Sequence, residues 1–376
     1  MRFAFSDDQL ELKRMLRALL AKECPMSRVR EVMYQQPGYD AALWARLSAE
    51  LGLTALLIDE EHGGAGFGWV ELCAVMEELG RSLAPVPLLS TSLAAQLLRS
   101  GGSAEQRACW LPQLASGEIW GSVALEAAGP GAEAQPFQFR EVSGEFELRG
   151  QITRWVDGHA AGLLIAAATD RSGQSSLFLI DASAHKAALR RERQPSLDAT
   201  RALGSVTLDR CVLPANALLA TDAGAALEGL RELACIALGA EQVGTAEACL
   251  EQAVEYAKTR EQFGRAIGSF QAIKHRCADM LLRLESARSA AYYAAWAAST
   301  GAPDTAELSH LCASYCAEAC FECAASNIQI HGGIGFTWEH DAHLYFKRAR
   351  ATESWLGSPA SHREAVARLW LDGARA

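Results

Sequence analysis

The feature that most restricts the fold of this chain is a change in the spacing of its apolar residues, which happens twice. Apolar residues first recur every three to four positions, which is typical of amphipathic helices. They then alternate with polar residues over short segments that are rich in β-branched side chains. Turn signals such as Ser143-Gly144 separate these segments. Helical spacing finally returns. We therefore predict an α+β chain with an α-helical domain over 1–117, an antiparallel β domain over 118–218 and a helical domain over 219–376.

Charge and hydropathy exclude several classes of partner. The formal net charge is -10, from 35 Lys and Arg against 45 Asp and Glu, so a globally basic surface for nucleic acid is absent. No apolar run reaches the roughly 20 residues that a membrane span requires. The first ten residues, MRFAFSDDQL, are too polar for a secretory signal. We expect a cytoplasmic protein with no nucleic-acid or membrane partner.

The cysteines are expected to serve packing. There are 11, and Cys312, Cys316, Cys320 and Cys323 fall on one face of a predicted Ala-rich helix. Metal sites usually take their ligands from turns or from two separated pairs, which one continuous helix does not supply. Small thiols on such a face favour close contact with another helix. The sequence therefore predicts no metal site.

Two stretches carry a recognisable pattern: YAKTREQFGRAIGSFQAIKH at residues 256–275 and QIHGGIGFTWEH at residues 329–340. Both resemble the signature segments of the acyl-CoA dehydrogenase family. Residues 43–88 are similar to the family's N-terminal helical domain, and residues 196–214 to the end of its β domain. The resemblance covers nearly the whole chain and keeps the order of the segments.

This resemblance implies a fold, a cofactor and an assembly. The expected fold ends in a four-helix bundle, and the expected assembly is a homotetramer, a dimer of dimers, with FAD at the subunit interfaces. A heterotetramer is the alternative. Family-wise, the residues expected to reach the FAD of a neighbouring subunit are Arg260, Gln262, Phe263 and Gly264. Those expected to serve its diphosphate and adenosine end are Gln329, Gly332 and Gly333.

Some residues near these motifs have two interpretations. Arg260 suits a pyrophosphate, although by position alone it would be a charge at a helix C-terminus. Trp155 occupies a position that lines the flavin ring in the family, and the alternative is a core aromatic. His331 is expected to be a hydrogen-bonded structural residue and not a catalyst.

The implied reaction is the α,β-dehydrogenation of an acyl-CoA thioester. A carboxylate removes the α-proton, the flavin N5 accepts the β-hydride, and hydrogen bonds polarise the thioester oxygen. Electrons would then pass to an electron-transfer flavoprotein. The acyl group cannot be inferred, because small residues near the expected site could leave room for a branched or polycyclic chain or could simply pack closely.

The position of the carboxylate departs from the commonest family pattern. Many members place it just before a glycine near the C-terminus, but here Leu356 precedes Gly357. Glu241, on the long helix before Arg260, is our candidate. Its neighbours three and four residues away are not cationic, so we expect no local salt bridge and a raised pKa, as suits a general base. Glu353 is the second candidate, although Arg350 is placed to pair with it.

Two alternatives to an active dehydrogenase remain open. The segment LEAAGPGAEA, residues 125–134, departs from the family pattern: Leu125 replaces a hydroxyl residue, and Gly131 stands near a usual serine. Together with Leu356, this favours a non-catalytic partner subunit of a heteromeric enzyme of the same fold. The other alternative is a related flavoenzyme that uses oxygen.

Overall fold

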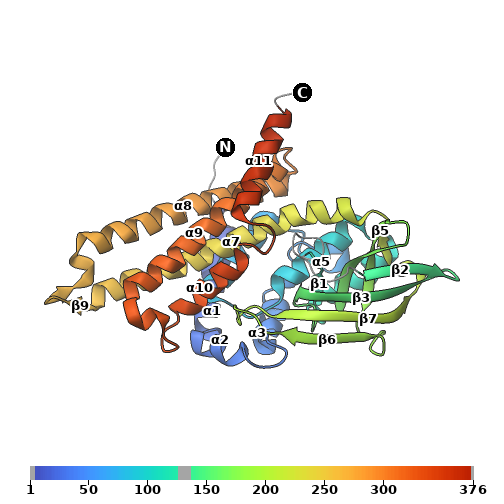
Figure 1. The fold of residues 1–376 in the computed structure, drawn as a ribbon, viewed down its shortest axis with the longest axis horizontal. Helices are drawn as coiled ribbons and strands as arrows, with labels where there is room; N and C mark the ends of the chain where they lie inside the picture. Colours follow the sequence, from blue (N-terminus) through green and yellow to red (C-terminus); the bar gives the residue numbers. More distant parts are fainter. Residues whose placement is uncertain (1–4, 126–136, 374–376) are drawn as a thin grey trace. The chain divides into compact units, whose positions relative to one another are not determined.

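The structure is a computed structural model, and it describes residues 5–125 and 137–373 (Figure 1). The chain forms two compact units. The helical unit comprises Met1–Arg30, Trp69–Ala84 and Cys235–Ala376, and the sheet unit comprises Glu31–Gly68 and Pro85–Ala234. Helices, strands and helices follow one another along the chain as predicted. In space, however, the predicted domain over 1–117 is divided between the two units.

The helical unit is built from long helices, of which α8 and α9 run side by side (Figure 1). A capping box begins α1: Gln9 N–H donates to the Ser6 hydroxyl, and Ser6 N–H donates to the Gln9 side chain. The helices are α1 (Asp7–Glu23), α2 (Met26–Val32), α4 (Trp69–Ser82), α7 (Ala223–Thr259), α8 (Gln271–Thr300), α9 (Thr305–His331), α10 (Ala342–Thr352) and α11 (Pro359–Gly373); α2 and α7 each continue across the boundary between the units.

Two glycines allow α4 and α7 to pack backbone against backbone. A Cβ added at Gly80 would lie 2.0 Å from the Glu241 carbonyl oxygen, and one added at Gly244 would lie 1.7 Å from that of Glu77. The Thr245 hydroxyl donates to the Gly80 carbonyl across the same contact at 3.2 Å. No side chain larger than hydrogen fits at either glycine. For Gly244, this supports close packing rather than space for an acyl chain.

The sheet unit contains one eight-stranded sheet. Its order is β6-β7-β3-β2-β4-β5-β8, with β1 pairing β4. The strands are β1 (Gly121–Val123), β2 (Phe137–Val142), β3 (Glu145–Val156), β4 (Leu163–Thr169), β5 (Ser175–Asp181), β6 (Leu189–Gln194), β7 (Leu203–Leu213) and β8 (Leu218–Ala220). A core of buried apolar side chains, among them Phe137, Phe178 and Val206, fills one side.

The sheet confirms one prediction and corrects two. The predicted turn joins β2 and β3, with Ser143 and Gly144 both at positive φ, as a tight hairpin needs. The sheet is not wholly antiparallel, because β4 pairs in parallel with both β1 and β2. Strand β6 was missed because LRRERQ lacks an apolar alternation; it is an edge strand that pairs only with β7 among the described strands.

Short helices complete the sheet unit. They are α3 (Ala41–Ala45), a π-helical turn (Arg46–Glu50), 3-10 turns (Leu53–Ala55, Glu60–His62 and Ala215–Ala217), α5 (Leu88–Gly101) and α6 (Ala104–Ser116). Gly52 follows the π-helical turn in a left-handed conformation, which glycine adopts readily and which ends the helix.

Helix α7 differs from the expectation based on hydropathy. By length and composition it alone among the described helices could cross a membrane, although no apolar run of that length was expected, but 83% of its apolar window is buried inside the protein. That burial is what a core helix of a folded domain shows. The four cysteines of α9 are likewise buried, and within the described residues no cluster could hold a metal ion.

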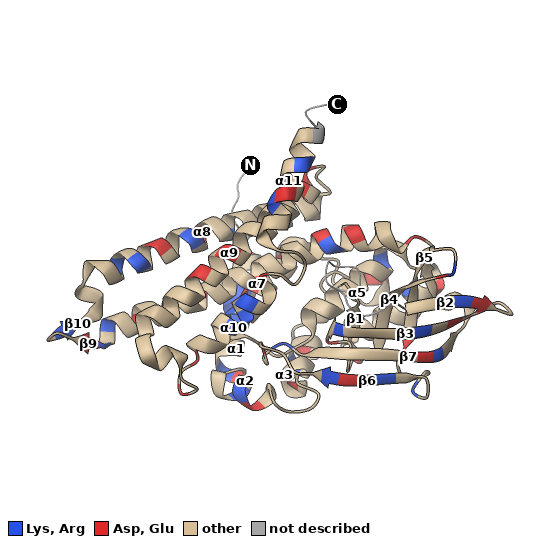
Figure 2. Cartoon of the chain, viewed as in Figure 1, with Lys and Arg blue, Asp and Glu red and all other residues tan. Residues whose placement is uncertain are grey.

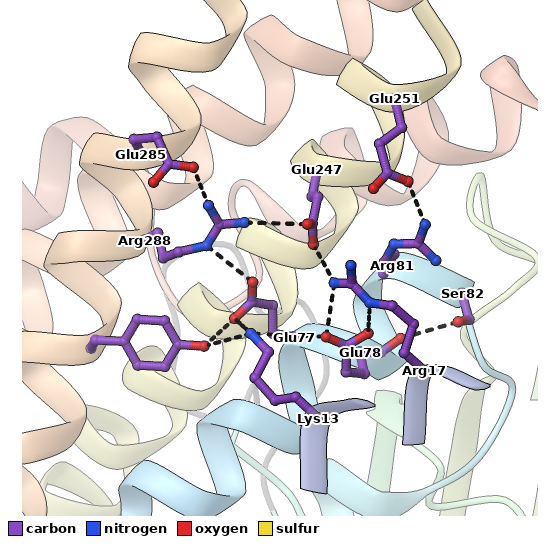
Figure 3. A network of polar contacts seen from close by, with 11 residues as sticks. Lys13, Arg17, Glu77, Glu78, Arg81, Ser82, Glu247, Glu251, Glu285 and Arg288 are labelled. Carbon is purple, nitrogen blue, oxygen red and sulfur yellow. Dashed lines mark hydrogen bonds and ion pairs between the residues drawn. The ribbon is translucent and has the colours of Figure 1, made fainter. Parts of the chain in front are cut away.

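A buried charge network ties α1 to the rest of the helical unit (Figure 3). Glu77 and Glu78 of α4 have side chains that are each only 1% exposed. Lys13 Nζ lies 2.5 Å from Glu77, and Arg17 Nε lies 2.8 Å from Glu78. Arg288 of α8 reaches Glu77 at 3.1 Å. Two adjacent carboxylates can be buried here because three cations from two other helices surround them.

We predict that Glu77→Ala lowers the free energy of unfolding by about 3 kcal/mol, because it removes the buried carboxylate that pairs with both Lys13 and Arg288. Urea unfolding measures this. The control is Arg14→Ala, which removes an exposed pair with Glu11 and should leave the midpoint unchanged. Equal effects of the two substitutions would contradict the prediction.

Burial alone would raise the pKa of Glu77, but Lys13 and Arg288 outweigh it and hold the pKa below its usual value. The folded state therefore favours the carboxylate, and the stabilisation is present above the unfolded pKa of about 4.5. It is lost as the pH falls below that value. We expect the acid-induced loss of stability to be shallower in Glu77→Ala than in the natural chain.

Candidate active site

Four of the predicted cofactor residues lie on a hairpin at the end of α7. Strand β9 (Glu261–Gln262) pairs with β10 (Arg265–Ala266), and Gln262 stands opposite Arg265. Arg260 leads into the hairpin, and its amide still donates to the Tyr256 carbonyl at 2.8 Å. All four predicted residues are exposed: Arg260, Gln262, Phe263 and Gly264.

The turn of this hairpin is strained at an aromatic residue. Phe263 and Gly264 both have positive φ, 54° and 74°, which suits glycine and disfavours a bulky side chain. The side chain of Phe263 is also 92% exposed to solvent, so burial does not offset this strain. Among the described aromatic rings, its ring meets only the edge of Phe270, at 6.1 Å between centroids. Strain combined with an exposed aromatic ring is typical of a functional contact.

The glycine-rich predicted residues lie where α9 ends. Gly332 closes the helix at φ 65° and ψ -142°, a conformation essentially restricted to glycine. Gly333 follows in a 3-10 turn (Gly332–Phe336), and a Cβ at either glycine would meet nothing within 4 Å. Gln329, Gly332 and Gly333 are exposed. The bare backbone of this turn is therefore accessible to a ligand.

One stacked pair brings the hairpin and the glycine turn to the same end of the helical unit. The rings of Tyr256, four residues before Arg260, and His331, two residues after Gln329, stack at 4.3 Å. His331 is buried, and its Nδ1 donates to the Asn327 carbonyl at 2.9 Å. It is thus the hydrogen-bonded structural residue that was predicted.

This end of the helical unit also carries exposed basic residues, near β9 and β10 in Figure 2. Besides Arg260 they are Lys258, Arg265, Lys274 and Arg276. Exposed guanidinium groups and unobstructed glycine backbone are the groups that bind a pyrophosphate. The residues present therefore fit a dinucleotide, in agreement with the FAD prediction.

Trp155 lies elsewhere, in the core of the sheet unit. Its side chain is fully buried in the apolar cluster, and its Nε1 donates to the Ser122 hydroxyl at 2.8 Å. A Cβ added at Gly158 would touch its ring at 2.5 Å. These contacts support the core-aromatic alternative. The neighbouring departure from the family pattern at Gly131 lies outside the described residues; Leu125 is buried.

Glu241 is buried as expected, but it has a cationic partner. Arg348 of α10 donates from Nη1 to Glu241 Oε1 at 2.6 Å, and both side chains are at most 5% exposed. The expectation of no local salt bridge holds, because no cation lies three or four residues away, but a partner from another helix was not predicted. Glu241 is also 19 residues before Arg260, about 28 Å along the helix axis.

The second candidate carboxylate is paired too. Glu353 contacts Arg350 three residues earlier, as predicted. Leu356 precedes Gly357, whose φ of 132° requires a glycine. Leu356 itself carries no group that accepts a proton.

Sequence reasoning missed Arg348. Its helix offers a signal, because the buried positions Tyr345, Arg348, Ala349 and Thr352 follow one face of α10. An arginine on a buried face requires a buried carboxylate partner. The sequence does not say which of the chain's carboxylates that partner is.

We predict that Arg348→Met lowers the free energy of unfolding by about 3–5 kcal/mol, because the carboxylate of Glu241 then stays buried without its cation. Adding Glu241→Gln should recover part of the loss. The matched control is Arg350→Met on the exposed side of α10. If urea unfolding shows the same small change for both arginines, the ion pair does not hold α10 on α7.

Comparison with known proteins gives a consistent result. The acyl-CoA dehydrogenase N-terminal domain matches residues 6–118, and the acyl-CoA dehydrogenase C-terminal domain matches residues 226–371. The chain is 36% identical over 364 residues to the acyl-CoA dehydrogenase IpdE2 of Mycolicibacterium smegmatis, covering 97% of this chain and 98% of that protein. IpdE2 of Mycobacterium tuberculosis is also 36% identical, with 96% of each chain covered.

Solved structures agree. A variant of the Tcur3481-Tcur3483 steroid ACAD superposes with a TM-score of 0.87 at 31% identity, covering 98% of this chain and 99% of that one. The ChsE4-ChsE5 complex from Mycobacterium tuberculosis gives 0.88 at 29% identity, with 98% of each chain covered. A glutaryl-coenzyme A dehydrogenase complexed with glutaryl-CoA gives 0.92 at 25% identity, with 99% and 97% covered.

Proposed function

Because this chain belongs to the acyl-CoA dehydrogenase family, we propose that it forms part of an FAD-dependent enzyme that converts an acyl-CoA thioester to its trans-2-enoyl-CoA. The observation that supports this most strongly is the hairpin after α7. Its tip points Phe263 away from the chain in a strained conformation, beside the exposed Arg260. Such a tip suits a cofactor held jointly with another subunit, as in a dimer of dimers.

Each of the predicted cofactor-binding residues would then have a defined role. Arg260 would bind the pyrophosphate, and the Gly332-Gly333 backbone would donate to the diphosphate and adenosine end, near Gln329. Phe263 would cover the cofactor and exclude water. When bound, the flavin would accept the β-hydride, and we propose that an electron-transfer flavoprotein then takes the electrons.

The source of the base has two candidates. Glu241 is the candidate within this chain, and it would have to leave Arg348 before it could take a proton. The ion pair at 2.6 Å between Arg348 and Glu241 favours another source of the base, a carboxylate supplied by a different chain of a heteromeric enzyme. Leu356 supports this, since it stands where many members carry the base. Two of the similar proteins are named as pairs, the ChsE4-ChsE5 complex and Tcur3481-Tcur3483.

Anaerobic flavin reduction tests both candidates. If Glu241 is the base, the purified chain is yellow and bleaches with acyl-CoA, and Glu241→Gln keeps FAD but slows bleaching by about two to four orders of magnitude. If a partner supplies the base, Glu241→Gln bleaches at the natural rate in the assembled enzyme. A chain that binds no flavin in any assembly would refute the proposed function, and rapid hydrogen peroxide production would indicate the oxygen-using alternative.

We predict opposite effects of Phe263→Asn on stability and cofactor binding. Asparagine followed by glycine is the preferred pair for this turn, so the cofactor-free protein should gain about 0.5–1 kcal/mol of unfolding free energy. FAD affinity should fall, because the aromatic contact is lost. Thermal unfolding and flavin fluorescence measure the two effects. The control is Ser143→Asn at the hairpin of β2 and β3, which should leave FAD affinity unchanged.

The substrate class can be screened with the same assay. One similar structure is that of a steroid ACAD variant, which makes ring-bearing acyl-CoA thioesters the first candidates, followed by branched and straight chains.

A further inference from the structure

The first turn of α10 is capped by a histidine ring. Asp341 precedes the helix, but its side chain makes no capping hydrogen bond. Instead, the amide of Ala342 donates to Nδ1 of His340 at 3.1 Å. Ala342 is fully buried, so its amide has no access to water and needs this acceptor. An amide can only donate, and His340 Nδ1 must therefore carry no proton.

A second histidine nearby is also held as an acceptor. Arg30 of α2 lies against Asp341, at 2.7 Å, and donates to the carbonyl of His340 at 2.9 Å. The same guanidinium reaches Nε2 of His343 at 3.5 Å. Since arginine has no acceptor, this contact favours a lone pair on the Nε2 of His343. One cation thus fixes the segment that leads into α10.

These histidines adjoin the glycine turn proposed to serve the cofactor. The ring of His340 packs on that of His331 at 4.1 Å, and His331 immediately precedes Gly332. On its other side His331 stacks on Tyr256 of α7. The turn is therefore held between the end of α9 and the cap of α10, and loosening the cap frees one side of it.

We propose that His340 is a positioning residue for the Gly332-Gly333 turn, and that its protonation weakens FAD binding in mildly acidic solution. The inference rests on the proposed FAD site. Protonation at Nδ1 would place a hydrogen against the Ala342 amide, break the cap and add a charge beside Arg30. The cap and the turn would loosen together, at the adenosine and diphosphate end of the cofactor.

The groups around His340 agree with this direction. Burial lowers the pKa of His340; Asp341 opposes the shift, and Arg30 adds to it. Burial also lowers the pKa of His331, with His340 adding to the effect, and lowers that of His343, which faces Lys347, Arg30 and Asp341. Because the folded state prefers neutral rings, the stabilisation is present above the unfolded pKa of about 6.5 and is lost as the pH falls below it.

The test compares two substitutions in the protein as purified, with its partner chain if it has one. His340→Asn keeps an acceptor for the Ala342 amide but does not titrate, and His340→Ala removes the acceptor. Between pH 7.5 and 5.5 we expect the FAD dissociation constant of the natural protein to rise by roughly three- to fourfold, because the pKa of His340 without FAD already lies below 6.5 and this limits the linkage. It should change less than twofold in His340→Asn, and should be high throughout in His340→Ala.

Flavin fluorescence on release measures the affinity, and thermal unfolding of the cofactor-free protein provides a second readout. In that readout the pH dependence should be reduced in His340→Asn. His185→Asn, in the sheet unit, is the control and should behave as the natural protein does. An unchanged pH dependence in His340→Asn would overturn the inference and leave the proposed function intact, whereas absence of FAD binding at every pH would overturn the proposed function itself.

Discussion

The close approach of α4 and α7 is the constraint on which the helical unit depends. Gly80 and Gly244 bring the two backbones together, and nothing larger than hydrogen fits at either position. This contact fixes where Glu77 of α4 and Glu241 of α7 lie, and both are buried carboxylates. Each then requires cations from other helices, and those cations hold α1, α8 and α10 in place. Two positions that only glycine can occupy, Gly80 and Gly244, thus determine the arrangement of several helices.

The same constraint explains why Glu241 differs from the sequence-based expectation. A helix sequence reveals the neighbours three and four residues away, and these are small or apolar around Glu241. It does not reveal a residue 107 positions later that another helix brings to 2.6 Å. The pairing with Glu353, by contrast, was predictable because Arg350 lies on the adjacent turn of the chain. Local partners follow from spacing, whereas tertiary partners require the packing.

The remaining predictions divide in the same way. The turn at Ser143-Gly144 and the order of helical and strand segments depend on local chemistry, and the structure confirms them. The parallel pairs of β4 depend on long-range pairing, and they differ from the prediction. For Trp155, strand alternation settles only that one face is buried; the contact with Ser122 shows that the indole lies in the core.

The edge strand β6 has a consequence for how chains of this kind meet. An edge presents unpaired amide and carbonyl groups, which can recruit a strand from another molecule and lead to aggregation. Here the edge strand LRRERQ carries the exposed charges of Arg190 and Glu192, whereas its other two arginines donate to backbone carbonyls of the same unit. Burying those charges against a second sheet would be costly, so this border resists edge-to-edge growth. Orderly assembly is thereby directed to surfaces other than this one.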